Sequence, residues 1–150
     1  MIVSADEIQA LRAAQNSVYE LILLDFLCHS NRIEGSTFTL DQIEALYARN
    51  RVIGEHFIDD IVETRNSLEV FDRMVDTLGV ELTPALLIEF ETILHKNTTM
   101  ADNGESGHFK YIPNRIRNSS VQVALPSDIL TAVPALLAEW ESSPKDFESI

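Results

Sequence analysis

The chain has 150 residues, of which 45% are apolar and 23% charged, and its net charge is −13 at pH 7. This length and composition predict a single globular domain with a buried core. The negative charge argues against nucleic-acid binding, because neutralising phosphates requires a basic face. No apolar run approaches the roughly 20 residues that a membrane span needs. Cys28 has no second cysteine to pair with and the first residues lack a basic signal-peptide start, so we expect a cytoplasmic protein.

The first half of the chain predicts helices. Ser4 followed by acidic residues is typical of a helix start, and apolar residues then recur at helical spacing to about Ile33, before Gly35. A capping-box pattern at residues 39–42 begins a second, short helix, which ends at residues 50–54. We therefore expect two helices here, the first of them long.

Two more helices and a change of pattern follow. A long amphipathic helix is predicted from Ile58 to Gly79, and Thr83-Pro84 begins another, because proline suits the first helical turn. The polar, glycine-containing residues 98–107 predict a loop.

The last third predicts a β-hairpin and a helix. Residues 108–116 and 121–125 resemble strands, and Pro113 would confine the first of them to a sheet edge. Residues 127–142 return to a helical pattern, in which Pro134 either kinks the helix or lies in its first turn. The predicted fold is therefore all-α with one protruding β-hairpin.

Glu34 is an unusual residue for its position. Ser30 and Glu34 lie four residues apart, on one face at the end of the predicted first helix. A carboxylate there meets the negative end of the helix dipole, at a cost of about 0.3–1 kcal/mol. Either Glu34 is simply solvated, or it awaits an arginine from elsewhere.

The pattern at residues 30–35, Ser-x-x-x-Glu-Gly, resembles the inhibitory motif of the Fic family of AMP-transferases. Further matches follow in the family's order. They are Thr64-Arg65-Asn66-Ser67-Leu68-Glu69, Ile93-Leu94-His95, Gly107-His108-Phe109-Lys110, Pro113-Asn114-Arg115-Ile116 and Leu136-Leu137-Ala138-Glu139-Trp140. The resemblance covers most of the chain and implies a helical fold in which residues 1–35 form the inhibitory helix, 36–97 the core helices and 108–125 a flap hairpin.

The family's catalytic motif is not present in these 150 residues. That motif, His-x-Phe-x-(Asp/Glu)-Gly-Asn-Gly-Arg-x-x-Arg, supplies the general base and the phosphate-binding turn, and ATP with Mg²⁺ is the complete enzyme's nucleotide. The resemblance therefore implies a regulatory and target-docking portion that has no catalytic residue, binds no cofactor and is inactive alone.

The resemblance also assigns roles to residues. Glu34 would pair with the last arginine of the catalytic motif, Ser30 would steady the helix end with a hydrogen bond, and Gly35 would allow the turn. In the flap, the residues that would dock an extended segment of a target protein bearing a Ser, Thr or Tyr hydroxyl are Lys110, Tyr111, Ile112, Pro113 and Asn114. The basic residues near this segment are equally explained as protection of a sheet edge.

Other functions compete with this one. The chain could instead be a helical binding module that inhibits a Fic protein in trans, as antitoxins do, or a helical interaction domain unrelated to Fic. The pairs Asp25…His29 and Glu91…His95 do not make a recognisable metal site. A fragment that lacks core helices would expose apolar surface, so we also expect self-association into a homo-oligomer.

Overall fold

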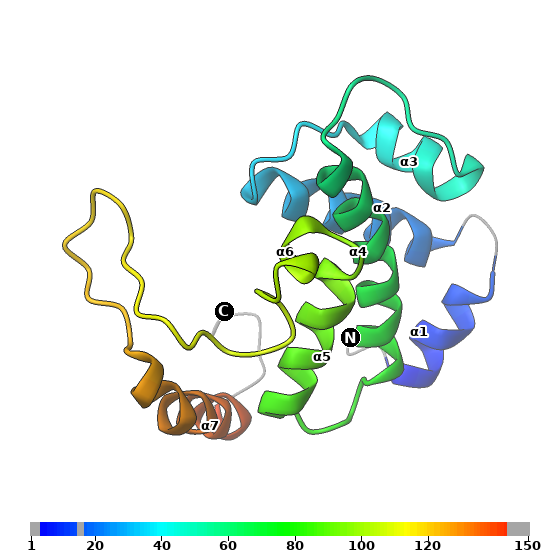
Figure 1. Ribbon diagram of the computed structural model, residues 1–150. Coiled ribbons are helices and arrows are strands. Elements are labelled where there is room, and N and C mark those ends of the chain that lie inside the picture. Colours follow the sequence, from blue (N-terminus) through cyan, green and yellow to red (C-terminus); the bar gives the residue numbers. More distant parts are fainter. Residues whose placement is uncertain (1–3, 15–16, 144–150) are drawn as a thin grey trace.

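The computed structural model describes residues 4–14 and 17–143, and this part of the chain contains seven helices and no strand. The helices are α1 (Ala5–Arg12), α2 (Val18–Ile33), α3 (Leu40–Arg49), α4 (Ile58–Asp76), α5 (Pro84–His95), α6 (Thr99–Asp102) and α7 (Pro126–Ser142). The prediction of a helical fold is confirmed. Helices α1–α5, which we call the bundle, pack together, and α7 lies apart from them (Figure 1).

The predicted helix starts are correct, because they depend on local hydrogen bonds. The side chains of Ser4 and Thr39 each accept a bond from the backbone three residues on, and Glu7 and Gln42 complete two capping boxes. Thr83 caps α5 in the same way, with Pro84 at the first helical position.

Two boundaries differ from the prediction, and the position of Pro134, which the sequence left open, is settled. The expected long first helix is divided into α1 and α2, and Ser17 begins α2 in an extended conformation. Residues 1–3, 15–16 and 144–150 lie outside the described part, so the predictions made for them are not addressed. The predicted loop 98–107 contains the short helix α6, capped by the hydroxyl of Thr98. Pro134 lies inside α7, in the ninth of its 17 positions.

The predicted β-hairpin is wrong. Residues 108–125, which we call the arm, leave the helices as an irregular extended loop and return to α7 without forming a strand (Figure 1). An isolated two-stranded hairpin is marginal in water unless one of its faces packs on something. In the arm the apolar side chains of Tyr111, Ile112, Ile116 and Val121 are all exposed, so no packed face stabilises a ladder.

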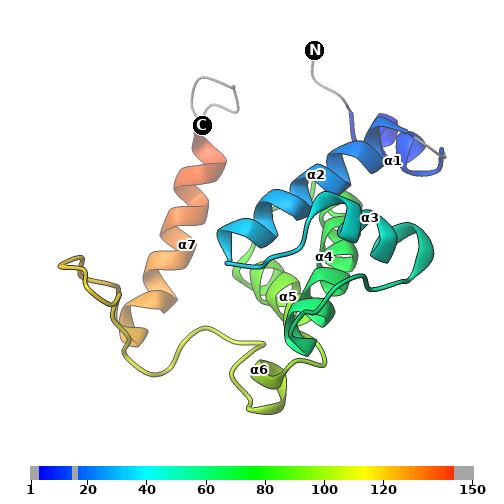
Figure 2. The ribbon, with the colours of Figure 1, turned by 90° about the horizontal axis from the view of Figure 1, so that it is seen from above.

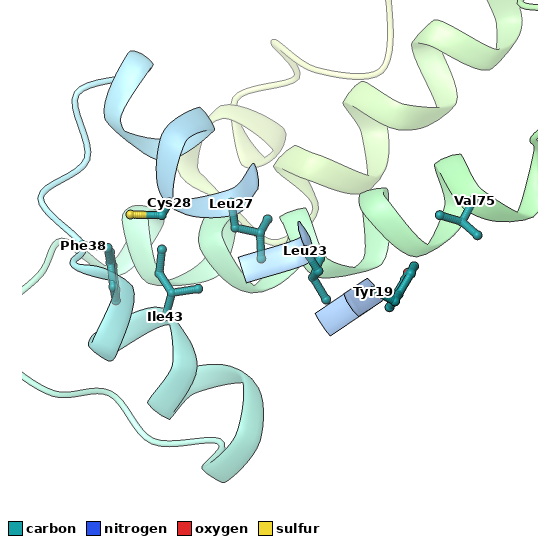
Figure 3. Packing of buried hydrophobic residues seen from close by; sticks show 7 residues of the cluster. All are labelled: Tyr19, Leu23, Leu27, Cys28, Phe38, Ile43 and Val75. Atoms are coloured by element: carbon teal, nitrogen blue, oxygen red, sulfur yellow. The ribbon is translucent and has the colours of Figure 1, made fainter. Parts of the chain in front are cut away.

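The core is formed chiefly by the inner face of α2. Seven buried residues make one cluster that runs along this helix (Figure 3): Tyr19, Leu23, Leu27, Cys28, Phe38, Ile43 and Val75. Leu27 is fully buried at its centre, and Phe71 of α4 packs edge-on against Tyr19 with ring centroids 5.6 Å apart. Burial of Cys28 agrees with its interpretation as a small apolar residue.

The second half of the bundle is the pairing of α4 with α5, and α7 stands to one side of it. Figure 2 shows α7 separated from α2, whereas its residues Leu137 and Ala138 share a small pocket with Leu82 and Pro84 at the start of α5. Among the described residues no helix is long and apolar enough to cross a membrane.

Candidate functional site

An open groove lies between the end of α2 and one face of α4 and α5. Its volume is about 630 Å³. We refer to it as the groove, and its lining residues are Phe26, Ser30, Asn31, Ile33, Glu34, Ser36, Asp60, Glu63, Thr64, Ser67, Val70, Met74, Leu94 and His95. Two of the predicted regulatory residues, Ser30 and Glu34, therefore face a site that is completed by helices far away in the sequence.

The end of α2 holds Glu34 at the rim of the groove. The helix stops in a Schellman motif: the amide of Gly35 donates to Arg32 at 3.1 Å, and that of Ser36 donates to Asn31 at 2.9 Å. Gly35 has φ +86°, a conformation that costs other residues energy, so its predicted role as the helix stop is confirmed. Glu34 is exposed, and its carboxylate has no hydrogen-bond or ion-pair partner among the described residues.

The hydroxyl of Ser30 forms no hydrogen bond with another described residue, so the helix end is held by main-chain bonds alone. The carbonyl of Ser30 accepts from the amide of Glu34 at 3.3 Å, an ordinary helical bond. Both polar groups of the motif are thus available at the groove.

A buried hydrogen bond fixes α2 against α4 beneath the groove. The side-chain amide of Asn31 donates to the hydroxyl of Thr64 at 2.8 Å, and both residues are less than 10% exposed. Buried polar groups are costly unless paired, so this bond sets the relative position of the two helices. It places Glu34 opposite the side of α4 that carries Asp60 and Glu63.

Asn66 of α4, which does not line the groove, supports α5. Its side-chain amide donates to the carbonyls of Leu94 and Lys96, both at 2.8 Å. These bonds satisfy acceptors at the end of α5 that would otherwise lack partners. They hold the end of α5, where His95 enters the groove.

Asp60 and Glu63 form one wall of the groove, which we call the acidic wall, and Glu63 contacts a histidine. Nδ1 of His95 lies 3.2 Å from Oε1 of Glu63, and its Nε2 lies 4.0 Å from Oε1 of Glu91. The other oxygen of Glu91 accepts from the amide of Gly107 at 2.5 Å, which anchors the start of the arm. The groove and the root of the arm are therefore joined through a short chain of polar contacts.

The five predicted docking residues lie in the arm, and none of them lines the groove. Nζ of Lys110 donates to Oδ1 of Asn114 at 2.6 Å, and the ring of Tyr111 lies 5.1 Å from that of His108. Figures 1 and 2 show the arm on the same side of the molecule as the end of α2. Tyr111 and Ile112 are more than 60% exposed, and Pro113 is exposed as well.

The charged form of His108 stabilises the start of the arm, residues 104–109, which we call its root. Its Nε2 lies 3.0 Å from the carbonyl oxygen of Gly104 and its Nδ1 lies 3.0 Å from that of Phe109. Only an imidazolium can donate to both oxygens at once. These two contacts, aided by the charge of Glu91, raise the pKa of His108 above its ordinary value.

Sequence reasoning did not identify Asn31, Asp60 and Glu63 as part of the site. The available signal was the polar face of α4, on which Asp60, Glu63, Thr64 and Ser67 recur at helical spacing. A polar stripe on a helix is ordinarily solvated, and only the tertiary packing shows that this one faces a groove.

Chemically, the groove suits a cation with an apolar neighbourhood. It presents Glu34, Asp60 and Glu63 beside apolar side chains, and no lysine or arginine lines it. Within the described residues no three His, Cys, Asp or Glu side chains gather as a metal site. A scan against protein-family models finds no match to this chain, and a search of curated proteins finds no similar sequence.

Proposed function

We propose that this chain is the regulatory and target-docking portion of a Fic-type AMP-transferase, which transfers AMP from ATP to a hydroxyl of a target protein. In this proposal Glu34 is the inhibitory carboxylate. One observation supports it most: Ser30 and Glu34, picked out by a local motif, line the same groove as Glu63 and His95, which come from α4 and α5. Nothing in the local sequence of residues 30–35 requires them to share a groove with residues of α4 and α5.

The geometry is suited to capturing an arginine. Glu34 has an unengaged carboxylate at the rim, and a guanidinium entering there would also come near the acidic wall of Asp60 and Glu63. Charge-assisted bonds from arginine to carboxylates are directional and often bidentate, which explains why a catalytic arginine held here could no longer hold the γ-phosphate of ATP. The catalytic segment itself is not among these 150 residues.

A peptide experiment tests the proposal. The probe is a synthetic peptide carrying the family's motif, with the helix that follows its Gly-Asn-Gly-Arg turn, and binding is followed by fluorescence polarisation. We expect Glu34→Gln to weaken binding by about tenfold, as for the loss of one charge-assisted contact. A peptide whose last arginine is replaced by glutamine should bind the parent chain equally weakly and be insensitive to Glu34→Gln.

The control is Glu44→Gln on the exposed side of α3, which makes the same charge change away from the groove. Equal binding of the arginine and glutamine peptides would contradict the inhibitory role of Glu34. The chain alone should show no Mg²⁺-dependent AMP transfer from radiolabelled ATP, and in a complete protein Glu34→Gly should increase transfer. If the peptide binds but a separate Fic enzyme is inhibited by the added chain, the chain acts in trans as an antitoxin-like inhibitor.

A further inference from the structure

The arm differs in charge from the rest of the molecule. It carries Lys110, Arg115 and Arg117, whereas all 24 acidic residues of the chain lie outside residues 108–125. Several of its apolar side chains are also exposed: Ile112 is 63% exposed, Ile116 53% and Val121 63%. The arm is thus a basic, apolar, extended segment on an acidic protein, and it projects away from the helices (Figure 1).

The groove has the complementary character. It is lined by the carboxylates of Glu34, Asp60 and Glu63 and by no lysine or arginine, and its apolar part is open to solvent, since Ile33 is 83% and Phe26 41% exposed. Large apolar side chains exposed beside a set of carboxylates are typical of a binding surface whose partner is apolar and basic. Among the described residues the arm is the segment with that composition.

We propose that the arm of one copy of this chain binds in the groove of a second copy. Arg115 and Arg117 flank Ile116 at the arm's exposed turn, which is closed by the bond from the amide of Ser119 to the carbonyl of Ile116 at 3.3 Å. In the groove, the two arginines face Glu34 and the acidic wall, and Ile116 packs against the apolar side chains. No residue of the arm lines the groove of its own copy, which leaves the groove open to a second copy's arm.

Long-range charge does not prevent this contact. Two copies of net charge −13 repel each other, but at physiological ionic strength charges are screened beyond about 8 Å, so the local complementarity decides. The exposed ion pairs set the partner and the orientation, and the apolar contacts supply most of the affinity. Self-association with a Kd on the order of micromolar is expected for such a small, partly polar interface.

The test is sedimentation velocity of the 150-residue chain as a function of concentration, at physiological ionic strength and without nucleotide or peptide. The arm variant is Arg115→Glu with Arg117→Glu, and the groove variant is Glu34→Arg, which places a cation favourably at a helix C-terminus. Each variant alone should self-associate about tenfold more weakly than the parent. A mixture of the two should recover association, because a basic rim then meets an acidic arm.

The matched control is Arg49→Glu with Arg51→Glu, which makes the same change in net charge at exposed residues at the end of α3 and just beyond it, and which should associate like the parent. Far-UV circular dichroism verifies that each variant folds. A parent chain that stays monomeric at every concentration overturns the proposal, as does an arm variant that associates like the parent, since the exposed side of α7 would then carry the contact. The proposal does not depend on the Fic assignment, because the peptide experiment can fail while the charge-swapped pair associates.

Discussion

The bundle and the C-terminal region, made of the arm and α7, use similar residues with opposite results. In the bundle, Leu23, Leu27 and Ile43 are at most 2% exposed. In α7, Leu130 is 79% and Leu136 64% exposed, and Ile129 is the one residue of that helix that is buried. The main-chain hydrogen bonds of a helix are made within its own segment, but burying an apolar residue needs a second element to pack against.

The difference shows what an apolar pattern does and does not specify. Helix α7 has the apolar composition of a buried helix, and its residues Pro134 and Leu137 line a small pocket together with Glu81 and Pro84. Its other apolar side chains offer a surface for a partner, which agrees with the proposal that this chain works with a further segment. Stability should therefore reside in the bundle, and recognition in the C-terminal region.

Replacing a leucine by alanine in each region should give the largest difference between the two regions in the free energy of unfolding. Leu27→Ala removes a fully buried side chain and leaves a cavity, so the free energy of unfolding should fall by about 2–5 kcal/mol. Leu136→Ala in α7 should change it by less than about 0.5 kcal/mol. Urea unfolding followed by circular dichroism measures both, and equal losses would show that α7 belongs to the same cooperative core.

Removing one side-chain hydrogen bond from each region should give the same contrast, with a smaller loss in the free energy of unfolding. Asn31→Ala leaves the hydroxyl of Thr64 buried without its donor and should destabilise the chain by about 1–3 kcal/mol. Asn114→Ala removes the exposed bond to Lys110 and should cost less than about 0.5 kcal/mol. The double variant Asn31→Ala with Thr64→Val should recover part of the loss, and additive losses would contradict the direct pairing of the two side chains.

Limited digestion with trypsin separates the regions by accessibility. The arm contains three cleavage sites in a segment without helix or strand, at the half-buried Lys110 and at the exposed Arg115 and Arg117, so the first cut should fall after one of these residues. Arg65 and Arg73, inside α4, should be cut only after the bundle unfolds. Mass spectrometry of the first fragments identifies the site, and an early cut within α4 would contradict the stability assigned to the bundle.

The smallest expected effect is the dependence of the arm's root on pH. The pKa of His108 is raised, so the stabilisation that its charged form gives is present below the unfolded value of about 6.5 and is lost as the pH rises through the folded value. NMR titration of His108, compared with a peptide of residues 105–111, measures the shift. Amide exchange of residues 104–109 should accelerate with pH beyond its intrinsic rate, and His108→Gln should abolish that excess. A His108 that titrates as in the peptide would contradict the double contact.

Much of the helical fold could be predicted because the signals are local. The capping boxes at Ser4 and Thr39, the Thr83-Pro84 start and the Gly35 stop all depend on hydrogen bonds or dihedral angles within a few residues. Such interactions form in the same way wherever the segment lies in the fold. The sequence by itself therefore determined where most helices begin and end, and it placed Ser30 and Glu34 on one helix face.

The tertiary structure alone decided what those helices build. It brings Glu34 to Glu63 and His95 through the buried bond between Asn31 and Thr64, residues 33 apart in the chain. It also decided against the predicted hairpin, because residues 108–125 alternate like strands but have no surface on which to pack. Pairing and burial depend on which distant segment lies alongside, and periodicity within one segment carries no information about that neighbour.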